Sequence, residues 1–211
     1  MLKSDYKPLC PVALPFQNRQ KYMHSFDLAN PVMADGYEDY LEPVMALCKA
    51  AGAVKGIAHM TVDEKIVEAG MSQRRPKPHV DGCFMPEFNW WGHEGPGWLH
   101  TCNEIGSGAY ARMSVIVAAS VSGCKAWRGD FDGQPKSDGD LSHIEDQLGN
   151  GEVLPPGVGY LLSPDCVHES MVFDKPTQRS FLRIALPVDF KFNESDIQET
   201  ANFVEGGDTG G

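Results

Sequence analysis

The sequence lacks any long hydrophobic run. In 211 residues no apolar stretch approaches the roughly 18 residues that a membrane-spanning helix needs. The N-terminal segment MLKSDYKPLCPVALPF also lacks the apolar stretch that a signal peptide requires. We therefore expect a cytoplasmic protein with no membrane partner.

Positive charge is also scarce. Lys and Arg number 18 against 29 Asp and Glu, which gives a formal net charge of −11. Because contacts with phosphates need a cationic surface, this balance argues against long nucleic acid as a partner. The local exception is QRRPKPH, residues 73–79, which contains Arg74, Arg75 and Lys77. This stretch is either a solvated loop or an anion-attracting rim beside a site.

Closely paired cysteines are missing as well. No two of the six cysteines have the CxxC spacing, so a zinc knuckle is not expected. Without a secretion signal, reduced thiols fit the cytoplasmic assignment.

Helical patterns are confined to the first third of the chain. Apolar residues at helical spacing predict a helix over about 36–51. Thr61 and Glu64 form a capping-box pattern, which predicts a second helix over about 62–69. The two helices together make a predicted helical buttress over about 36–70.

Short strand-like segments separated by Gly and Pro follow. They lie at 113–122, 151–163, 168–173 and 179–187. We predict a mostly β protein with flanking helices (α+β). The expected fold is a double-stranded β-helix, that is, a jelly-roll or cupin-like barrel.

The domain boundaries follow from the same reading. We expect a single domain over 1–192, with its jelly-roll core at about 78–190. Residues 193–211 form an acidic, Gly-rich C-terminal tail.

The stretch PHVDGC, residues 78–83, contains a candidate metal site. In an extended segment, residues two apart point to the same face, so His79 and Asp81 should lie side by side. A lone HxD pattern is weak, but His168 opens another predicted strand. Two histidines and one carboxylate can occupy one face of a non-haem iron, whereas a structural zinc would want a fourth protein ligand.

Two arginines strengthen this pattern. Arg179 lies 11 residues after His168 and Arg183 lies 15 after it, both within the mostly apolar strand RSFLRIAL. Spaced by four, they share a face of the strand. Buried arginines need anions, and a guanidinium binds a carboxylate through two parallel hydrogen bonds.

The order HxD, distant His, then Arg on the next strand resembles the Fe(II)/2-oxoglutarate-dependent dioxygenases. The stretch HESMVFDKPTQRSFLR is similar to the distal segment of the taurine dioxygenase and phytanoyl hydroxylase branches. The resemblance implies that His79, Asp81 and His168 bind the metal. It also implies that Arg179 holds 2-oxoglutarate and that Arg183 meets an anionic substrate.

A competing argument favours Arg183 as the cosubstrate anchor. If DKPT closes a symmetric hairpin, His168 pairs across from Arg183 and not from Arg179. Both arginines therefore stay candidates at this point.

By this resemblance the protein is an oxygenase that uses Fe(II), 2-oxoglutarate and O2. It would hydroxylate a C–H bond and release succinate and CO2. The expected substrate is a small molecule, a nucleotide or base, or an amino-acid side chain. The aromatic residues Trp90, Trp91, Trp98 and Trp127 are candidate substrate contacts.

Two alternatives use the same residues. A cupin-like metal enzyme would bind a metal without 2-oxoglutarate. A non-catalytic β-barrel would use the arginines for an anionic ligand and would bind no metal.

Overall fold

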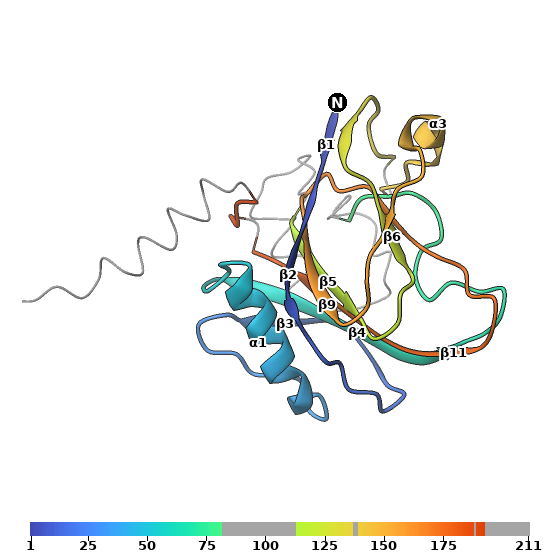
Figure 1. Ribbon diagram of the computed structural model, residues 1–211. Coiled ribbons are helices and arrows are strands. Elements are labelled where there is room, and N and C mark those ends of the chain that lie inside the picture. The colour runs from blue at the N-terminus through green and yellow to red at the C-terminus, as the bar shows by residue number, and fades with distance from the viewer. Residues whose placement is uncertain (82–112, 137–138, 188, 193–211) are drawn as a thin grey trace, which may run out of the picture.

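A computed structural model describes residues 1–81, 113–136, 139–187 and 189–192 (Figure 1). Their regular secondary structure consists mostly of antiparallel strands, with a few short helices, which confirms the predicted mostly β class. No helix in these ranges has the length and apolar character needed to cross a membrane. The predicted strands at 113–122, 151–163, 168–173 and 179–187 are all present, with shorter or shifted ends.

Six strands form the largest sheet. Their spatial order is β2 (Tyr6–Pro11), β9 (Val158–Leu162), β5 (Val115–Ala119), β11 (Thr177–Ala185), β4 (Ile57–Val67) and β3 (Gln20–Asp27). All neighbours in this sheet pair antiparallel.

Two smaller sheets and four short helical elements complete the described fold. The three-stranded sheet has the order β10 (His168–Ser170), β6 (Cys124–Ala126) and β8 (Glu152–Val153), and β1 (Leu2–Ser4) pairs with β7 (Gly129–Phe131). The helical elements are η1 (Glu38–Tyr40), α1 (Leu41–Ala50), η2 (Ser142–Ile144) and α3 (Glu145–Leu148).

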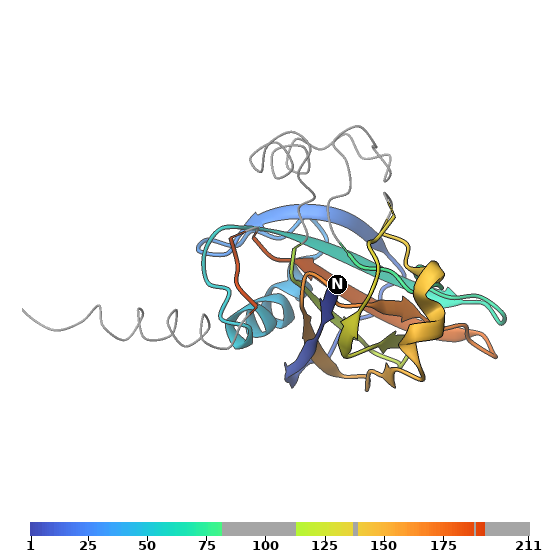
Figure 2. The ribbon, with the colours of Figure 1, turned by 90° about the horizontal axis from the view of Figure 1, so that it is seen from above.

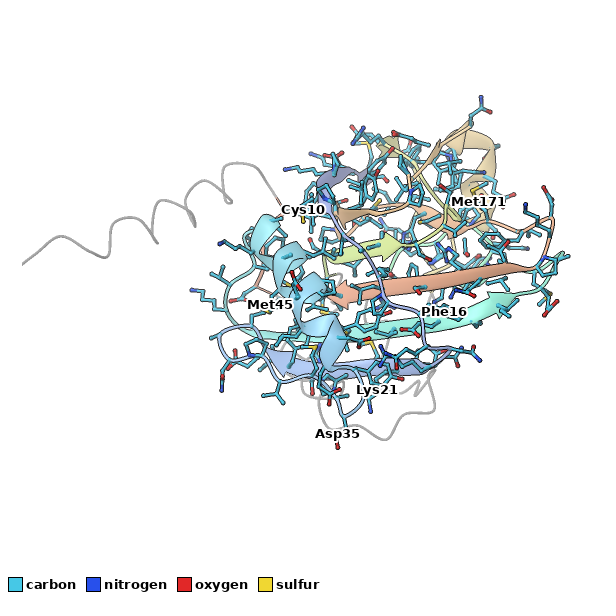
Figure 3. The ribbon with its side chains drawn as sticks, turned by 60° about the horizontal axis from the view of Figure 1, so that its bottom comes forward. Cys10, Phe16, Lys21, Asp35, Met45 and Met171 are labelled. Atoms are coloured by element: carbon cyan, nitrogen blue, oxygen red, sulfur yellow. The ribbon has the colours of Figure 1, made fainter. Side chains whose placement is uncertain are left out.

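One face of the large sheet packs against α1. Figure 3 shows this helix lying against the sheet, with β11, β4 and β3 running behind it. Alternate residues of β4 and β11, among them Met60, Val62 and Leu182, are buried in the same cluster as Leu47 of the helix. Gly159 of β9 leaves room for this packing, because an added Cβ would overlap the Leu47 side chain. Most of the helix-side core therefore comes from every second residue of the strands.

The opposite face of the sheet is covered by the three-stranded sheet and its connections. Val117, Tyr160 and Phe181 from the large sheet share a buried cluster with Ala126 of β6 and with Cys166. Seen from above in Figure 2, β3, β4 and β11 run side by side. Polar residues of β4 and β11 also point to this second face, which makes it the side where a site can form.

The predicted helix over 62–69 is wrong, and with it the second half of the predicted buttress over 36–70. Residues 62–67 belong to β4, the longest described strand, and residues 68–69 follow its end, whereas the helix expected over 36–51 is present as η1 and α1. The sequence of β4 alternates between the two faces of the sheet, with Ala58, Met60 and Val62 in the helix-side core. This two-residue period decides the structure over the short capping pattern.

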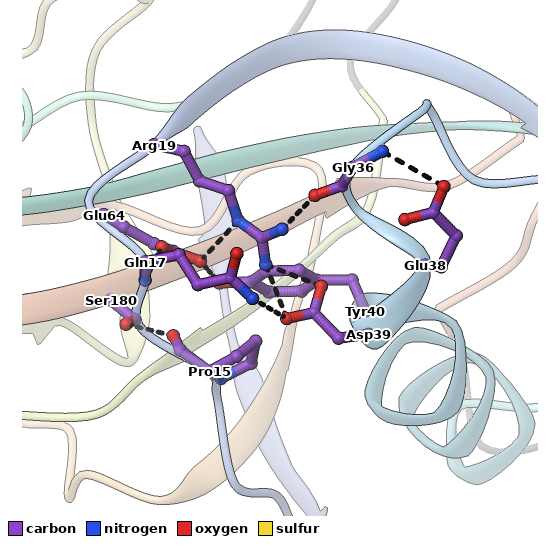
Figure 4. A network of polar contacts seen from close by, with 9 residues as sticks. All are labelled: Pro15, Gln17, Arg19, Gly36, Glu38, Asp39, Tyr40, Glu64 and Ser180. Carbon is purple, nitrogen blue, oxygen red and sulfur yellow. Dashed lines mark hydrogen bonds and ion pairs between the residues drawn. The ribbon is translucent and has the colours of Figure 1, made fainter.

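Glu64, read above as a capping residue, has a different role. Its carboxylate accepts a hydrogen bond from the Tyr40 hydroxyl (2.8 Å), one from Arg19 Nε (3.3 Å) and one from the Gln17 backbone N–H (Figure 4). Arg19 also binds Asp39 at 2.6 Å. The network joins the segment before β3, the start of α1 and β4, so the carboxylate is fully paired although its side chain is buried.

Candidate metal and anion site

Backbone pairing brings His79 and His168 together. Each N–H donates to the other residue's carbonyl oxygen at 3.0 Å, which forms an isolated antiparallel bridge. The two rings lie side by side, with their centroids 4.4 Å apart. Two residues that are 89 positions apart in the chain are thereby held next to each other.

Asp81 completes the group. One ligand atom each from His79, Asp81 and His168 lies within 4.8 Å of the others, so these three side chains could hold a metal ion. The carboxylate oxygen Oδ2 of Asp81 lies 3.6 Å from His168 Nε2. The same-face placement of residues 79 and 81 is the geometry that their two-residue spacing predicts.

The surroundings leave both imidazoles with one nitrogen available. The Nδ1–H of His79 donates to the Lys77 carbonyl oxygen at 2.7 Å, and that of His168 donates to the Cys166 carbonyl oxygen at 3.0 Å. In a neutral imidazole with Nδ1 protonated, Nε2 carries the lone pair. Backbone carbonyls that fix the tautomer in this way are typical of histidines that bind metals.

Charge in the site also suits a cation. Burial, followed by the charge of the neighbouring His168, lowers the pKa of His79 to about 3. Burial alone would raise the pKa of Asp81, but Arg183 and the two histidines hold it well below its usual value. At neutral pH the group therefore presents a neutral His79 imidazole and a carboxylate, the protonation states that bind metal.

Arg183 forms an ion pair with the candidate metal ligand. Its Nε lies 3.2 Å from Asp81 Oδ2, and the residue is 6% exposed. Asp81 thus already has a cationic neighbour, which orients the carboxylate beside the histidines.

Arg179 has a different environment. It is 1% exposed and donates from Nε to the Val121 carbonyl oxygen (2.8 Å) and from Nη1 to Gln73 Oε1. Its buried Nη2 has no hydrogen-bond partner among the residues that the structure describes. No carboxylate within the described ranges forms an ion pair with it. Burial lowers its pKa to about 10, so it stays a cation at neutral pH. An uncompensated buried guanidinium is costly, and an anion bound beside Nη2 would offset that cost.

Arg179 lines the same pocket as the histidines. The residues that line this pocket are Arg74, His79, Val117, Gly123, Cys124, His168, Glu169, Ser170, Arg179 and Phe181. A cation whose Nη2 has no hydrogen-bond partner in the described part of the chain and two candidate metal-binding imidazoles therefore face one space.

The hairpin argument for Arg183 loses its premise. β10 pairs with β6, while β11 pairs with β4 and β5, so His168 has no cross-strand partner on β11. Thr61 and Val117 flank Arg183 in the sheet instead. The choice between Arg179 and Arg183 as the cosubstrate anchor therefore rests on their side-chain contacts and not on strand register.

Of the four candidate substrate residues, the structure describes Trp127. Trp90, Trp91 and Trp98 lie outside the described residues. Trp127 is 5% exposed, packs in a buried cluster with Val80 and Val167, and donates its indole N–H to the Gly149 carbonyl oxygen at 3.2 Å. It is not among the described residues that line the pocket, and its contacts are those of a packing residue.

Gln73 and Asp63 were not singled out from the sequence. Gln73 binds Arg179 through Oε1 and donates from Nε2 to the Asp63 carbonyl oxygen at 2.6 Å. Asp63 lies in β4, where the sequence predicted a helix, so its inward direction could not be inferred. The nearest signal was the basic stretch 73–79, whose reading as an anion-attracting rim beside a site fits the position of Arg74 in the pocket lining.

Comparisons with known proteins add no relative. No family model matches the sequence, and a search of curated proteins found no significant match.

Proposed function

We propose that this protein is an Fe(II)- and 2-oxoglutarate-dependent oxygenase with a double-stranded β-helix, or jelly-roll, fold. It would hydroxylate a C–H bond of a small molecule, a nucleotide or base, or an amino-acid side chain. One observation carries the proposal: the buried cation Arg179, whose Nη2 has no hydrogen-bond partner among the described residues, lines a pocket together with both histidines of a His–Asp–His group that could hold a metal.

The donor set supports iron. Two imidazoles and one carboxylate form the facial triad that suits non-haem Fe(II) oxygenases and leaves open coordination positions. Structural zinc would need a fourth ligand, and in the described part of the chain His79, Asp81 and His168 are the only group of His, Cys, Asp or Glu that could hold a metal ion.

The arginine supports a dicarboxylate cosubstrate. 2-Oxoglutarate has a keto acid end that can chelate a metal and a second carboxylate at its other end. Arg179 Nη2 would bind that distal carboxylate, while Val121 and Gln73 hold the guanidinium in place. Arg183 would orient Asp81 through the ion pair between them.

Bound iron, 2-oxoglutarate and O2 together would supply the oxidant that hydroxylates a substrate C–H bond, with release of succinate and CO2. The chain's own residues would position and protect this chemistry. His79 and His168 would offer Nε2 because the Lys77 and Cys166 carbonyls hold their other nitrogens. The buried walls of the pocket would exclude water from the reacting groups.

The test is an anaerobic titration of the purified protein with Fe(II) and 2-oxoglutarate, followed by the visible charge-transfer absorption of the metal–keto acid chelate. We expect the band in the wild type and in His143→Ala, because His143 is an exposed histidine of η2 outside the site. We expect no band in His168→Ala. Iron binding without a band would favour the cupin-like alternative, and no iron binding would favour the non-catalytic barrel.

A further inference from the structure

Arg74 belongs to the basic stretch that stood out in the sequence, and the structure places it in the pocket of the histidines. It lines this pocket together with His79, His168 and Arg179. Its side chain is 18% exposed, so it is not the freely solvated side chain of a surface loop.

The two pocket arginines share an aromatic neighbour. The Arg74 Cζ lies 5.7 Å from the centroid of the Phe181 ring, and the Arg179 Cζ lies 5.5 Å from the same centroid. Two guanidinium groups on one ring in one pocket repel each other, and the presence of Arg74 contributes to the lowered pKa of Arg179. An anion between them would relieve this repulsion.

The backbone fixes Arg74 against the strand of the distal histidine. The Arg74 N–H donates to Ser170 Oγ at 3.2 Å, and the Ser170 N–H donates to the Arg75 carbonyl oxygen at 2.8 Å. Ser170 closes the strand β10 that His168 opens. The basic stretch is therefore anchored two residues from a candidate metal ligand.

The Arg74 side chain is held on the pocket by β4. Its Nη1 lies 3.6 Å from Asp63 Oδ2, and the Lys65 ammonium lies 3.4 Å from the same oxygen. Because Lys65 also faces this carboxylate, Asp63 keeps a cationic neighbour when the Arg74 guanidinium contacts a ligand in the pocket. Gln73, the residue before Arg74, holds Arg179 at the same time.

We propose that Arg74 is a second anion-binding residue of this pocket and that it and Arg179 bind the distal carboxylate of the cosubstrate from two sides. This inference rests on the proposed function, because the ligand it names is 2-oxoglutarate. Two guanidiniums offer each carboxylate oxygen its own donors, and they make the pocket select keto acids with a second carboxylate.

The experiment compares two adjacent arginines. Arg74→Gln and the matched control Arg75→Gln remove the same charge from neighbouring positions, but Arg75 is not among the described residues that line the pocket. The protein is loaded with Mn(II), which is redox-inert here, and titrated calorimetrically with 2-oxoglutarate and with oxalate. Oxalate can chelate the metal but has no distal carboxylate.

We expect Arg74→Gln to weaken 2-oxoglutarate binding by about tenfold and to leave oxalate binding unchanged, while Arg75→Gln changes neither. Arg74→Lys retains the charge beside Asp63 without the guanidinium fork, and it should bind 2-oxoglutarate with intermediate affinity. It also carries the test if Arg74→Gln fails to fold.

Equal 2-oxoglutarate affinity in wild type and Arg74→Gln would overturn the inference, as would an equal loss for both ligands, which indicates a merely structural role. In both cases the proposed function stands, because the wild type binds 2-oxoglutarate. A wild type that binds Mn(II) but no 2-oxoglutarate would overturn the proposed function itself, and this inference with it.

Discussion

The two faces of the six-stranded sheet are built from alternate residues of the same strands, yet they differ in nearly every property. On β11, Leu182 and Ile184 point into the core beneath α1, while their neighbours Arg179 and Arg183 point to the face of the histidines. The helix-side face buries mainly apolar groups. The other face buries Arg179 and Arg183, together with the Asp63 carboxylate that Arg74 and Lys65 flank.

This contrast separates stability from chemistry within single strands. Burial of apolar surface on the helix side supplies the favourable free energy of folding. On the site side, buried charge opposes folding, since a cation such as Arg179, which forms no ion pair within the described ranges, loses its hydration. The apolar helix-side face therefore stabilises the fold that holds the candidate site in place, although this face contributes no described residue to the site.

The largest expected effect comes from the helix-side face. Leu182→Ala should lower the free energy of unfolding by roughly 2–5 kcal/mol, because Leu182 is fully buried and its truncation leaves a cavity. Mn(II) affinity of the folded protein should stay at the wild-type value. Denaturant unfolding and a metal titration check the two parts, and a lost metal affinity in folded protein would contradict the separation of the faces.

The site-side face should gain stability from its ligand. With Mn(II) present, 2-oxoglutarate at 100 times its dissociation constant should stabilise the wild type by about 2.7 kcal/mol. Arg179→Gln at the same ligand concentration should gain much less, because the buried cation that binds the distal carboxylate is gone. Denaturant unfolding with and without ligand measures both, and an equal gain would rule out Arg179 as the anchor.

Glu64 tests a polar network that lies away from the histidines. Glu64→Gln should cost roughly 1.5–3 kcal/mol of stability, because it removes the charge that Arg19 and the Tyr40 hydroxyl pair with in a buried position. Metal and 2-oxoglutarate affinities should not change. Altered ligand affinity at unchanged stability would show that the network supports the site and not only the fold.

The effect that is smallest near neutral pH is a difference in pH dependence. Burial holds the pKa of His79 at about 3, below its ordinary value of 6.5, so below pH 6.5 the unfolded chain binds a proton that the folded chain does not. The metal-free protein should therefore lose stability as the pH falls from about 6.5 towards about 3. The slope for this one proton is up to ~1.4 kcal/mol per pH unit.

The His79→Gln variant lacks the imidazole that binds this proton in the unfolded chain. Its free energy of unfolding should fall less steeply than that of the wild type between pH 7 and pH 5, as measured by denaturant titration at each pH. Parallel curves for the two proteins would mean that His79 is protonated at its ordinary pKa in the folded state.

Part of the fold and of the candidate site could be predicted from the sequence, because local sequence patterns were sufficient for those parts. The two-residue spacing of His79 and Asp81 and the apolar strand around Arg179 each encode a direction for their side chains. The helix over 36–51 had a clear period as well. For β4 two local signals competed, and the alternation that buries Met60 and Val62 against α1 outweighed the capping pattern of Thr61 and Glu64.

Other features depend on contacts between distant segments. The bridge between His79 and His168 and the placement of Gln73 beside Arg179 join segments far apart in the chain. The assumed hairpin after His168 was wrong because β10 pairs with β6, a partner that no local pattern around His168 specifies. Trp127 was a candidate substrate contact because of its aromatic character. It is buried in a core cluster with Val80 and Val167, which lie far from it in the sequence.

The most direct measurement is an anaerobic titration of Fe(II)-loaded wild type and Arg179→Gln with 2-oxoglutarate, followed by the chelate absorption. Both proteins should bind iron equally, because the His–Asp–His group is intact in both. We predict that Arg179→Gln needs at least about tenfold more 2-oxoglutarate to develop the band. Half-saturation of both proteins at the same 2-oxoglutarate concentration would contradict the account.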